Sequence, residues 1–132
     1  MNKKLELTEE QWQQRLTPEE FRVLRRRGTE QANTGCFVGT HAPGTYVCAG
    51  CGNPLFASGE KFESGTGWPS FTKPIGPDAV ITREDNSHGM RRAEVICAKC
   101  DGHLGHVFSD GPPPARQRYC MNSVAMKHLP QP

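Results

Sequence analysis

Two Cys-x-x-Cys pairs, Cys48 with Cys51 and Cys97 with Cys100, constrain the fold of this 132-residue chain more than any other feature. Each pair is followed closely by a glycine, which suits a tight turn whose backbone amides face the sulfurs. Two such turns brought together form a tetrahedral four-thiolate site, the kind that zinc prefers. Since 45 residues separate the pairs, more than in a zinc ribbon, we expect a sheet between them. The spacing therefore predicts one structural Zn²⁺ per chain, bound by these four cysteines.

Two other interpretations of the cysteines remain open. One pair could be a redox dithiol, although neither lies at the strand-to-helix junction that a thioredoxin-type motif requires. A site made of Cys97, Cys100, His103 and His106 is also conceivable, but it is cramped and leaves the first pair without a role.

The pattern after Thr34 predicts a mainly β protein. Short apolar runs alternate there with Gly, Pro, Asn and Asp clusters, which is typical of antiparallel strands and turns. The runs lie at 44–48, 54–56, 79–82, 93–97, 105–108 and 118–126. Apolar residues are only 35% of the chain, while Gly (14) and Pro (11) are frequent, so we expect a loop-rich domain partly stabilised by metal. We interpret 1–132 as a single domain, with its β core at about 34–129.

The N-terminal segment, about 8–28, is expected to be helical. Thr17, Pro18 and Glu20 form a capping box for a helix that should run to Arg27, with Gly28 just beyond it. Thr8 should cap a shorter helix before it. The run Arg25–Arg27 is favourable at a helix C-terminus; a nucleic-acid arm is the less plausible interpretation.

The charge balance does not call for a nucleic acid or a membrane as partner. The chain has 16 basic and 14 acidic residues, a net charge of +2. Its first residues lack the apolar run of a signal peptide, and no stretch is apolar enough to span a membrane. We expect a cytoplasmic protein and a monomer, in a compartment where paired cysteines are more often metal ligands or redox groups than disulfides.

Cys120, in "RQRYCMNSVAM", is a lone thiol. If this segment is a strand, alternation puts Arg118, Cys120 and Asn122 on one face. The positive charge of Arg118 would favour the nucleophilic thiolate. A small buried hydrophobe is the alternative, but Arg and Asn on the same face argue against it.

Other candidate site residues lie in "GHLGHVFSDG" and "SGTGWPSF". His103 and His106 could donate protons near neutral pH. Strict alternation would put them on opposite faces, but Gly102 and Gly105 make a bulge plausible. Trp68, held before a proline, could form an apolar wall for a small ligand. Each of these could instead be an ordinary structural residue.

Four motifs in this order, "CAGCGNPLF", "SGTGWPSF", "CAKCDGHLGHVFSDGP" and "RYCMNSVAM", resemble B-type methionine sulfoxide reductases, the peptide-methionine (R)-S-oxide reductases. The match runs from about Thr8 to Leu129. The resemblance implies a β-tent-like fold of two antiparallel sheets with short N-terminal helices. It also implies that the zinc is structural and lies away from the catalytic cysteine.

The resemblance further implies a role for each candidate residue. Cys120 attacks the sulfur of methionine-R-sulfoxide in oxidised proteins and becomes a sulfenic acid as methionine leaves. His103 is the principal acid, assisted by His106, and Trp68 packs on the substrate methyl group. Three further residues support the site: Arg118 and Asn122 lower the thiol pKa, and Asp110 orients a histidine or Arg118.

One position departs from the family pattern. Many members carry the resolving cysteine inside "SG-x-GWPSF", where this chain has Thr66. Our hypothesis is that Cys36 condenses with the sulfenic acid of Cys120 and that thioredoxin reduces the disulfide. Direct reduction by an external thiol is the alternative. Two other functions remain open: a zinc-stapled β-tent binding module without turnover, and another thiol enzyme such as a peroxide reductase.

Overall fold

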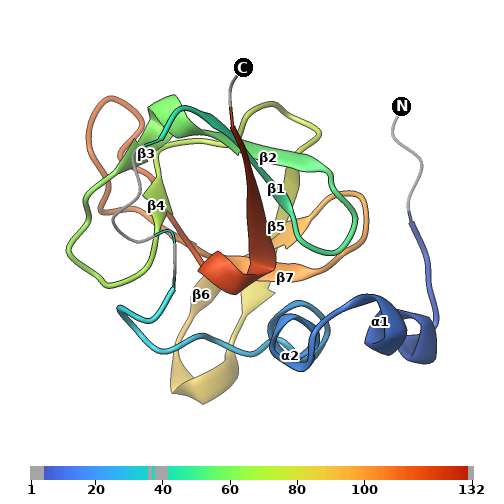
Figure 1. The fold of residues 1–132 in the computed structure, drawn as a ribbon. Coiled ribbons are helices and arrows are strands. Elements are labelled where there is room, and N and C mark those ends of the chain that lie inside the picture. Colours follow the sequence, from blue (N-terminus) through green and yellow to red (C-terminus); the bar gives the residue numbers. More distant parts are fainter. Residues whose placement is uncertain (1–4, 36, 38–41, 131–132) are drawn as a thin grey trace.

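Two antiparallel sheets make up most of the structure (Figure 1). The computed structural model describes residues 5–35, 37 and 42–130. The helices are α1 (Glu9–Arg15) and α2 (Pro18–Arg26), with the 3-10 helices η1 (Ser58–Glu60), η2 (Ser87–Gly89) and η3 (Ser123–Ala125). The strands are β1 (Gly44–Cys48), β2 (Pro54–Ala57), β3 (Lys61–Phe62), β4 (Ser70–Phe71), β5 (Val80–Asp85), β6 (Arg92–Cys97), β7 (His103–Phe108), β8 (Arg118–Met121) and β9 (Met126–Pro130). The smaller sheet has the order β2-β1-β9 and the larger β3-β4-β8-β7-β6-β5, so the predicted mainly β, two-sheet fold is confirmed.

Both N-terminal helices begin as predicted. The Thr8 and Thr17 hydroxyls accept hydrogen bonds from the backbone N–H groups of Gln11 and Glu20, which complete two capping boxes. Among the described residues, no helix is both long and apolar enough to cross a membrane.

The end of α2 differs from the prediction by one residue. The helix stops at Arg26, and Arg27 adopts the left-handed conformation with φ of 56°. The Gly28 N–H closes the helix end by donating to the Arg22 carbonyl at 2.9 Å. Left-handed backbone is costly for arginine; here the guanidinium forms ion pairs with Asp85 and Glu94 in the larger sheet.

Aromatic side chains join the two sheets. Phe56 of β2 stacks on Phe71 of β4 with ring centroids 4.4 Å apart, and Tyr46 of β1 meets Phe71 edge-on at 5.2 Å. All three are fully buried. Helix α2 packs against β7 and η3, and Trp12 of α1 extends this core. Helix α2 thus lies against the larger sheet, and α1 lies beside α2, as Figure 1 shows.

The C-terminal run 118–126, predicted as one strand, crosses between the sheets instead. β8 ends at Met121 in the larger sheet, η3 follows, and β9 joins the smaller sheet beside β1. Asn122 makes this break because its backbone N–H and its side-chain amide both donate to the Leu104 carbonyl, at 2.9 and 3.0 Å. The chain can therefore leave β8 immediately after Cys120 and Met121.

Candidate active site and metal centre

Cys120 lies in a row of side chains that crosses the larger sheet. The residues directly opposite one another on adjacent strands are Arg83 of β5, Glu94 of β6, His106 of β7, Cys120 of β8 and Ser70 of β4. Directly opposed residues project from the same face of an antiparallel sheet. The strand register therefore brings a thiol, an imidazole and a carboxylate together from segments far apart in the sequence.

A cavity of about 240 Å³ opens over this row. Strands β6, β7 and β8 supply most of its lining residues, and loops supply the others. Its lining residues are Thr29, Thr66, Trp68, Arg92, Gly105, His106, Phe108, Arg118, Cys120, Met121 and Asn122. Five predicted site residues therefore share the cavity: Trp68, His106, Arg118, Cys120 and Asn122. His103, Asp110 and the four paired cysteines do not line it.

The Cys120 thiol is subject to opposing influences. Burial is the largest effect and raises the pKa of Cys120, whereas a hydrogen bond with the Thr66 side chain and the positive charge of Arg118 lower it. The net direction is upward, opposite to the one expected from Arg118 alone. Arg118 also has a partner of its own, since its Nε and Nη2 donate to the two carboxylate oxygens of Asp110 at 2.8 and 3.1 Å. Of the two partners expected for Asp110, the structure thus has Arg118 rather than a histidine.

The two histidines lie side by side despite the alternation of the strand. A register shift between Val95 and Ile96 of β6 places His103 opposite Ile96 and Gly105 opposite Val95, so a bulge falls between the histidines. Their ring centroids are 5.4 Å apart with an interplanar angle of 68°. The bulge considered in the sequence is therefore present.

Each histidine is bound to a buried carboxylate. His103 Nδ1 lies 2.7 Å from Glu94 Oε2, and His106 Nε2 lies 2.8 Å from Asp85 Oδ2. Burial is the largest effect on the pKa of His103 and lowers it against the opposing influence of Glu94. The bond to His106, followed by those to Ser87, holds the pKa of Asp85 far below its usual range.

The sequence analysis missed these two carboxylates. Glu94 had a readable signal, because it stands in the apolar run "AEVIC" on the same face as buried Ile96, where a carboxylate needs partners. Asp85 had none, because it lies in the charged segment "TREDNS" and is buried only by the tertiary fold. Phe108, a cavity residue also missed, could have been inferred by alternation from His106.

Glu30 ties the loop after α2 to the cavity walls. Its carbonyl accepts from Trp68 Nε1 at 2.9 Å, and its N–H donates to Asn122 Oδ1 at 2.9 Å. Its carboxylate accepts from the Val124 N–H at 3.0 Å. The Trp68 ring is therefore held at the cavity edge, and both ends of the Asn122 amide are used in fixing the backbone.

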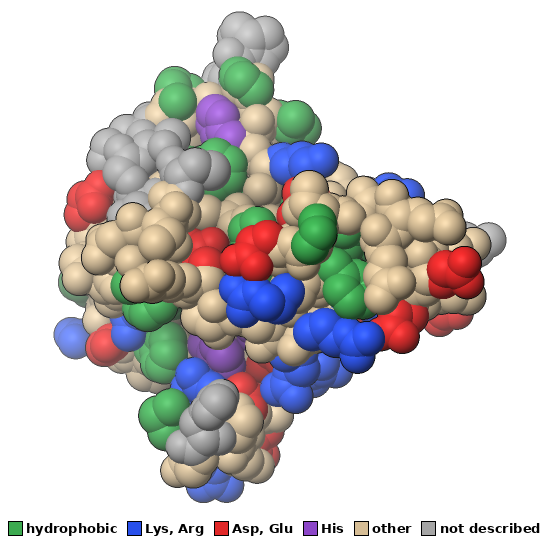
Figure 2. Space-filling view, turned by 60° about the horizontal axis from the view of Figure 1, so that its bottom comes forward, with side chains coloured by type: hydrophobic (Ala, Val, Ile, Leu, Met, Phe, Trp, Pro, Cys, Tyr) green, Lys and Arg blue, Asp and Glu red, His purple; other side chains and the backbone are tan. Residues whose placement is uncertain are grey.

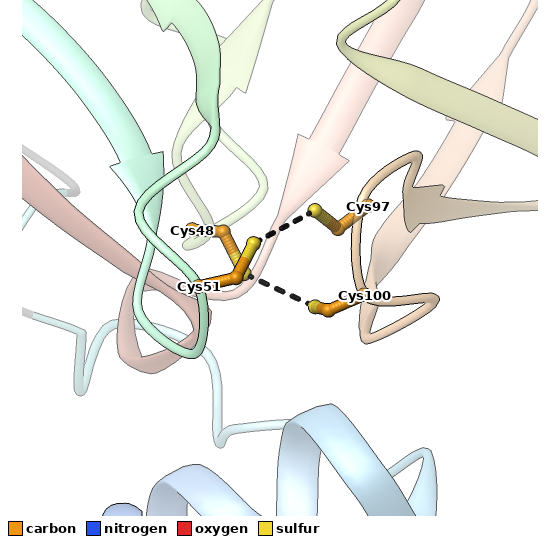
Figure 3. A group of neighbouring side chains, drawn as sticks. All are labelled: Cys48, Cys51, Cys97 and Cys100. Atoms are coloured by element: carbon orange, nitrogen blue, oxygen red, sulfur yellow. Dashed lines mark hydrogen bonds between the residues drawn. The ribbon is translucent and has the colours of Figure 1, made fainter. Parts of the chain in front are cut away.

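The four paired cysteines meet at the tips of two turns (Figure 3). All four Sγ atoms lie within 4.8 Å of one another; Cys48 and Cys100 are 3.7 Å apart, and Cys51 and Cys97 are 3.5 Å apart. In the first turn Gly52 has the left-handed backbone conformation, with φ of 81°, which agrees with the tight turn expected after the cysteine pair. In the second turn that residue is Asp101, with φ of 61°.

Gly102 is needed because there is no room for a side chain, and not for a left-handed backbone as at Gly52. A Cβ atom there would come within 3.0 Å of Leu24 and 3.3 Å of Cys100 Sγ.

The sulfur positions fit a tetrahedral metal ion. Zinc–sulfur bonds of about 2.3 Å give a tetrahedron with edges of about 3.8 Å, close to the measured separations. The neighbouring thiols, Cys100 above all, together with burial, raise the pKa of Cys48 well above its usual range. Hydrogen bonds within the same cluster, that of Cys100 above all, lower the pKa of Cys51 and Cys97. A cation between the four sulfurs would let all of them ionise together. The cluster can therefore hold a metal ion, away from the cavity.

One predicted site residue, Cys36, lies outside the described residues. Thr66, the residue in the position where the resemblance leads one to expect a resolving cysteine, lines the cavity together with Cys120, and its side chain lowers the pKa of that thiol. That position is therefore adjacent to the candidate nucleophile, and in this chain it carries a hydroxyl.

Comparison with known proteins agrees with this geometry. The family model described as the SelR domain matches residues 16–130. A peptide methionine sulfoxide reductase MsrB of Leptospira interrogans is 52% identical over 127 residues, covering 96% of this chain and 97% of the relative. The MsrB proteins of Bradyrhizobium diazoefficiens and Methanosarcina mazei are 56% and 54% identical over 124 and 123 residues, covering 94% and 93% of this chain and 89% and 88% of the relatives. The chain therefore belongs to the SelR-domain family of B-type peptide methionine sulfoxide reductases.

Proposed function

We propose that this protein reduces methionine-R-sulfoxide in oxidised proteins to methionine, with Cys120 as nucleophile. The observation that carries the proposal is the placement of the Cys120 thiol in a cavity with His106 as its cross-strand neighbour, in a member of this family. A sulfoxide needs a nucleophile at its sulfur and a proton donor at its oxygen, and the two residues face the same space. Trp68 and Phe108 supply apolar surface for the methyl group.

The first step transfers the sulfoxide oxygen to Cys120. Cys120 attacks the substrate sulfur, the sulfur–oxygen bond breaks, and the oxygen passes to Cys120 as a sulfenic acid while methionine leaves. The thiol is oxidised by two electrons and the sulfoxide is reduced by two. The proton that the thiol gives up is returned through a histidine to the oxygen.

We propose that His106 is the proton donor nearest the substrate. The resemblance instead implies His103 as the principal acid, with His106 assisting it. His106 lines the cavity, and since Asp85 occupies its Nε2, Nδ1 remains for a ligand. His103 lies behind it, buried, and burial lowers the pKa of His103, so that it is a weak reservoir of protons. Its role is to pack against the His106 ring and orient it.

We further propose that Cys36 resolves the sulfenic acid. Four of the six cysteines are committed to the metal cluster and one to the cavity, which leaves Cys36 as the sole remaining thiol. Condensation of the Cys36 thiol with the sulfenic acid releases water and forms a Cys36–Cys120 disulfide. A dithiol protein of the thioredoxin class then reduces the disulfide.

The metal in the cluster is proposed to be Zn²⁺, bound by Cys48, Cys51, Cys97 and Cys100. Four thiolates with these separations suit zinc, which supplies a redox-inert crosslink between the two turns. None of the four ligands lines the cavity, so the ion has no part in the chemistry of the sulfoxide.

A single turnover without added reductant tests the function. Reduced, metal-loaded protein is mixed with each epimer of a methionine sulfoxide peptide, and released methionine and remaining thiols are counted. We expect about one methionine per chain from the R epimer alone, and a Cys36–Cys120 disulfide peptide. Release of methionine without that disulfide would support the reductase activity but exclude the resolving role of Cys36. No methionine from either epimer would refute the reductase and favour a binding module.

A further inference from the structure

Arg27 connects the end of α2 to the two buried carboxylates of the site. Its Nε lies 3.1 Å from Glu94 Oε2, and its Nη2 lies 3.3 Å from Asp85 Oδ1. The two carboxylates are 0% and 5% exposed, whereas the Arg27 side chain is 49% exposed. Among the ion pairs of the described residues, Arg27 is the one cation that contacts both acids.

The same two carboxylates hold the two histidines. Glu94 Oε2 is shared between Arg27 and His103 Nδ1, while Asp85 places Oδ1 toward Arg27 and Oδ2 toward His106. On the face drawn in Figure 2, basic and acidic side chains lie close together, and a histidine is recessed among them. A change of charge at Arg27 should therefore affect both histidines, because a single carboxylate lies between Arg27 and each ring.

We propose, building on the reductase function above, that Arg27 is a positioning residue that holds the carboxylates of Glu94 and Asp85 aimed at His103 and His106, and so tunes proton delivery to the sulfoxide. It does not line the cavity and has no contact with the reacting atoms. It stands at the end of α2 in a left-handed backbone conformation, and no motif of the resemblance includes it.

The electrostatic environment determines the sign of the effect. The charged or titratable groups around the histidines are Arg27 from α2, Arg83 and Asp85 from β5, Arg92 and Glu94 from β6, and Arg118 and Cys120 from β8. Burial lowers the pKa of His103, Glu94 raises it, and the charge of Arg27 adds to the lowering. Removing the charge of Arg27 should therefore make His103 easier to protonate.

The fold should survive this removal. Without Arg27, Glu94 keeps Arg83 at 2.8 Å and His103 at 2.7 Å. Asp85 keeps His106 at 2.8 Å and the Ser87 N–H at 3.0 Å. No carboxylate is left buried without a partner, which is the situation that destabilises proteins most.

The experiment compares Arg27→Gln, Arg27→Lys and Arg26→Gln in the metal-loaded protein. Arg26 is a matched control, because it ends the same helix, is similarly exposed and pairs with Glu9 instead. Histidine ring protons are titrated by NMR without substrate, and the single-turnover rate of methionine formation is measured against pH. In Arg27→Gln, we expect the His103 midpoint to move up by about half a pH unit at low ionic strength. The rate profile should change over the same pH range, because His103 orients the proton donor His106. The shift should shrink in high salt.

The control variants and the readouts separate the possible failures. Arg27→Lys, which keeps the charge, should titrate close to the wild type, and so should Arg26→Gln. If Arg27→Gln loses rate equally at every pH and its His103 titration is unchanged, Arg27 is merely structural and the proposal is wrong. If the wild type forms no methionine, the reductase function fails, while the titration still decides whether Arg27 acts on His103.

Discussion

Replacing Thr66 by Val tests how this site controls its nucleophile. Valine keeps the shape of threonine but lacks the hydroxyl, whose interaction with the Cys120 thiol lowers the pKa of that thiol. In the wild type this interaction opposes the effect of burial, which is the largest influence and raises the pKa of Cys120. Without the hydroxyl, the charge of Arg118 remains as the main opposing influence, and Asp110 shares that charge. The pKa of Cys120 should therefore rise further.

The size of the effect follows from the bond that is lost. A hydrogen bond to a charged group contributes about 1.5–3 kcal/mol, and sulfur is a weak acceptor, so we take the lower end. Since one pKa unit corresponds to about 1.4 kcal/mol, the midpoint should rise by about one unit. At neutral pH the thiolate fraction, and with it the rate of attack on the sulfoxide, should fall about tenfold.

Alkylation of Cys120 by iodoacetamide, followed across pH by mass spectrometry of its peptide, measures this midpoint directly. The Cys36→Ser background removes the other free thiol, and Thr66→Ser serves as the control because it keeps the hydroxyl. We expect Thr66→Ser to titrate like the parent and Thr66→Val to titrate about one unit higher. A Thr66→Val midpoint equal to or below that of Thr66→Ser would refute the role of the hydroxyl.

Three further predictions follow from the contacts of the site. Asp110→Asn weakens the bidentate pair with Arg118, so the guanidinium charge should act more fully on Cys120 and lower its pKa; a higher alkylation midpoint would contradict this. Trp68→Phe loses the hydrogen bond to the Glu30 carbonyl, so the free energy of unfolding should fall by about 1 kcal/mol in urea titrations. KM should rise more than kcat falls. Unchanged stability and an unchanged KM would show that Trp68 does not contribute to substrate binding. Cys48→Ser removes one of four sulfurs, so metal content measured by mass spectrometry should fall from about one ion per chain to near zero, with a lower melting temperature. Retained metal and full stability would exclude the four-cysteine site.

Local signals in the sequence were sufficient for most of the secondary structure. The capping boxes at Thr8 and Thr17 are complete within four residues, so they could be read without knowledge of the fold. The strand at Gly44–Cys48 followed from its apolar run between turn residues. The single strand expected over 118–126 was wrong because what breaks it, the pairing of Asn122 with Leu104 and Glu30, comes from distant segments.

For the candidate site, too, some features could be predicted from the sequence and others depended on the tertiary structure. The sequence by itself indicated most of the candidate residues: the Cys-x-x-Cys spacing identified the four cysteines that can hold a metal ion, and alternation placed Arg118 beside Cys120. Only the tertiary structure decided which groups surround them, because strand register and burial depend on residues far apart in the chain. The register set Glu94, His106 and Cys120 in one row, and burial reversed the direction expected for the Cys120 pKa. An arginine that reads as an ordinary helix end became, through a left-handed turn, the partner of two buried carboxylates.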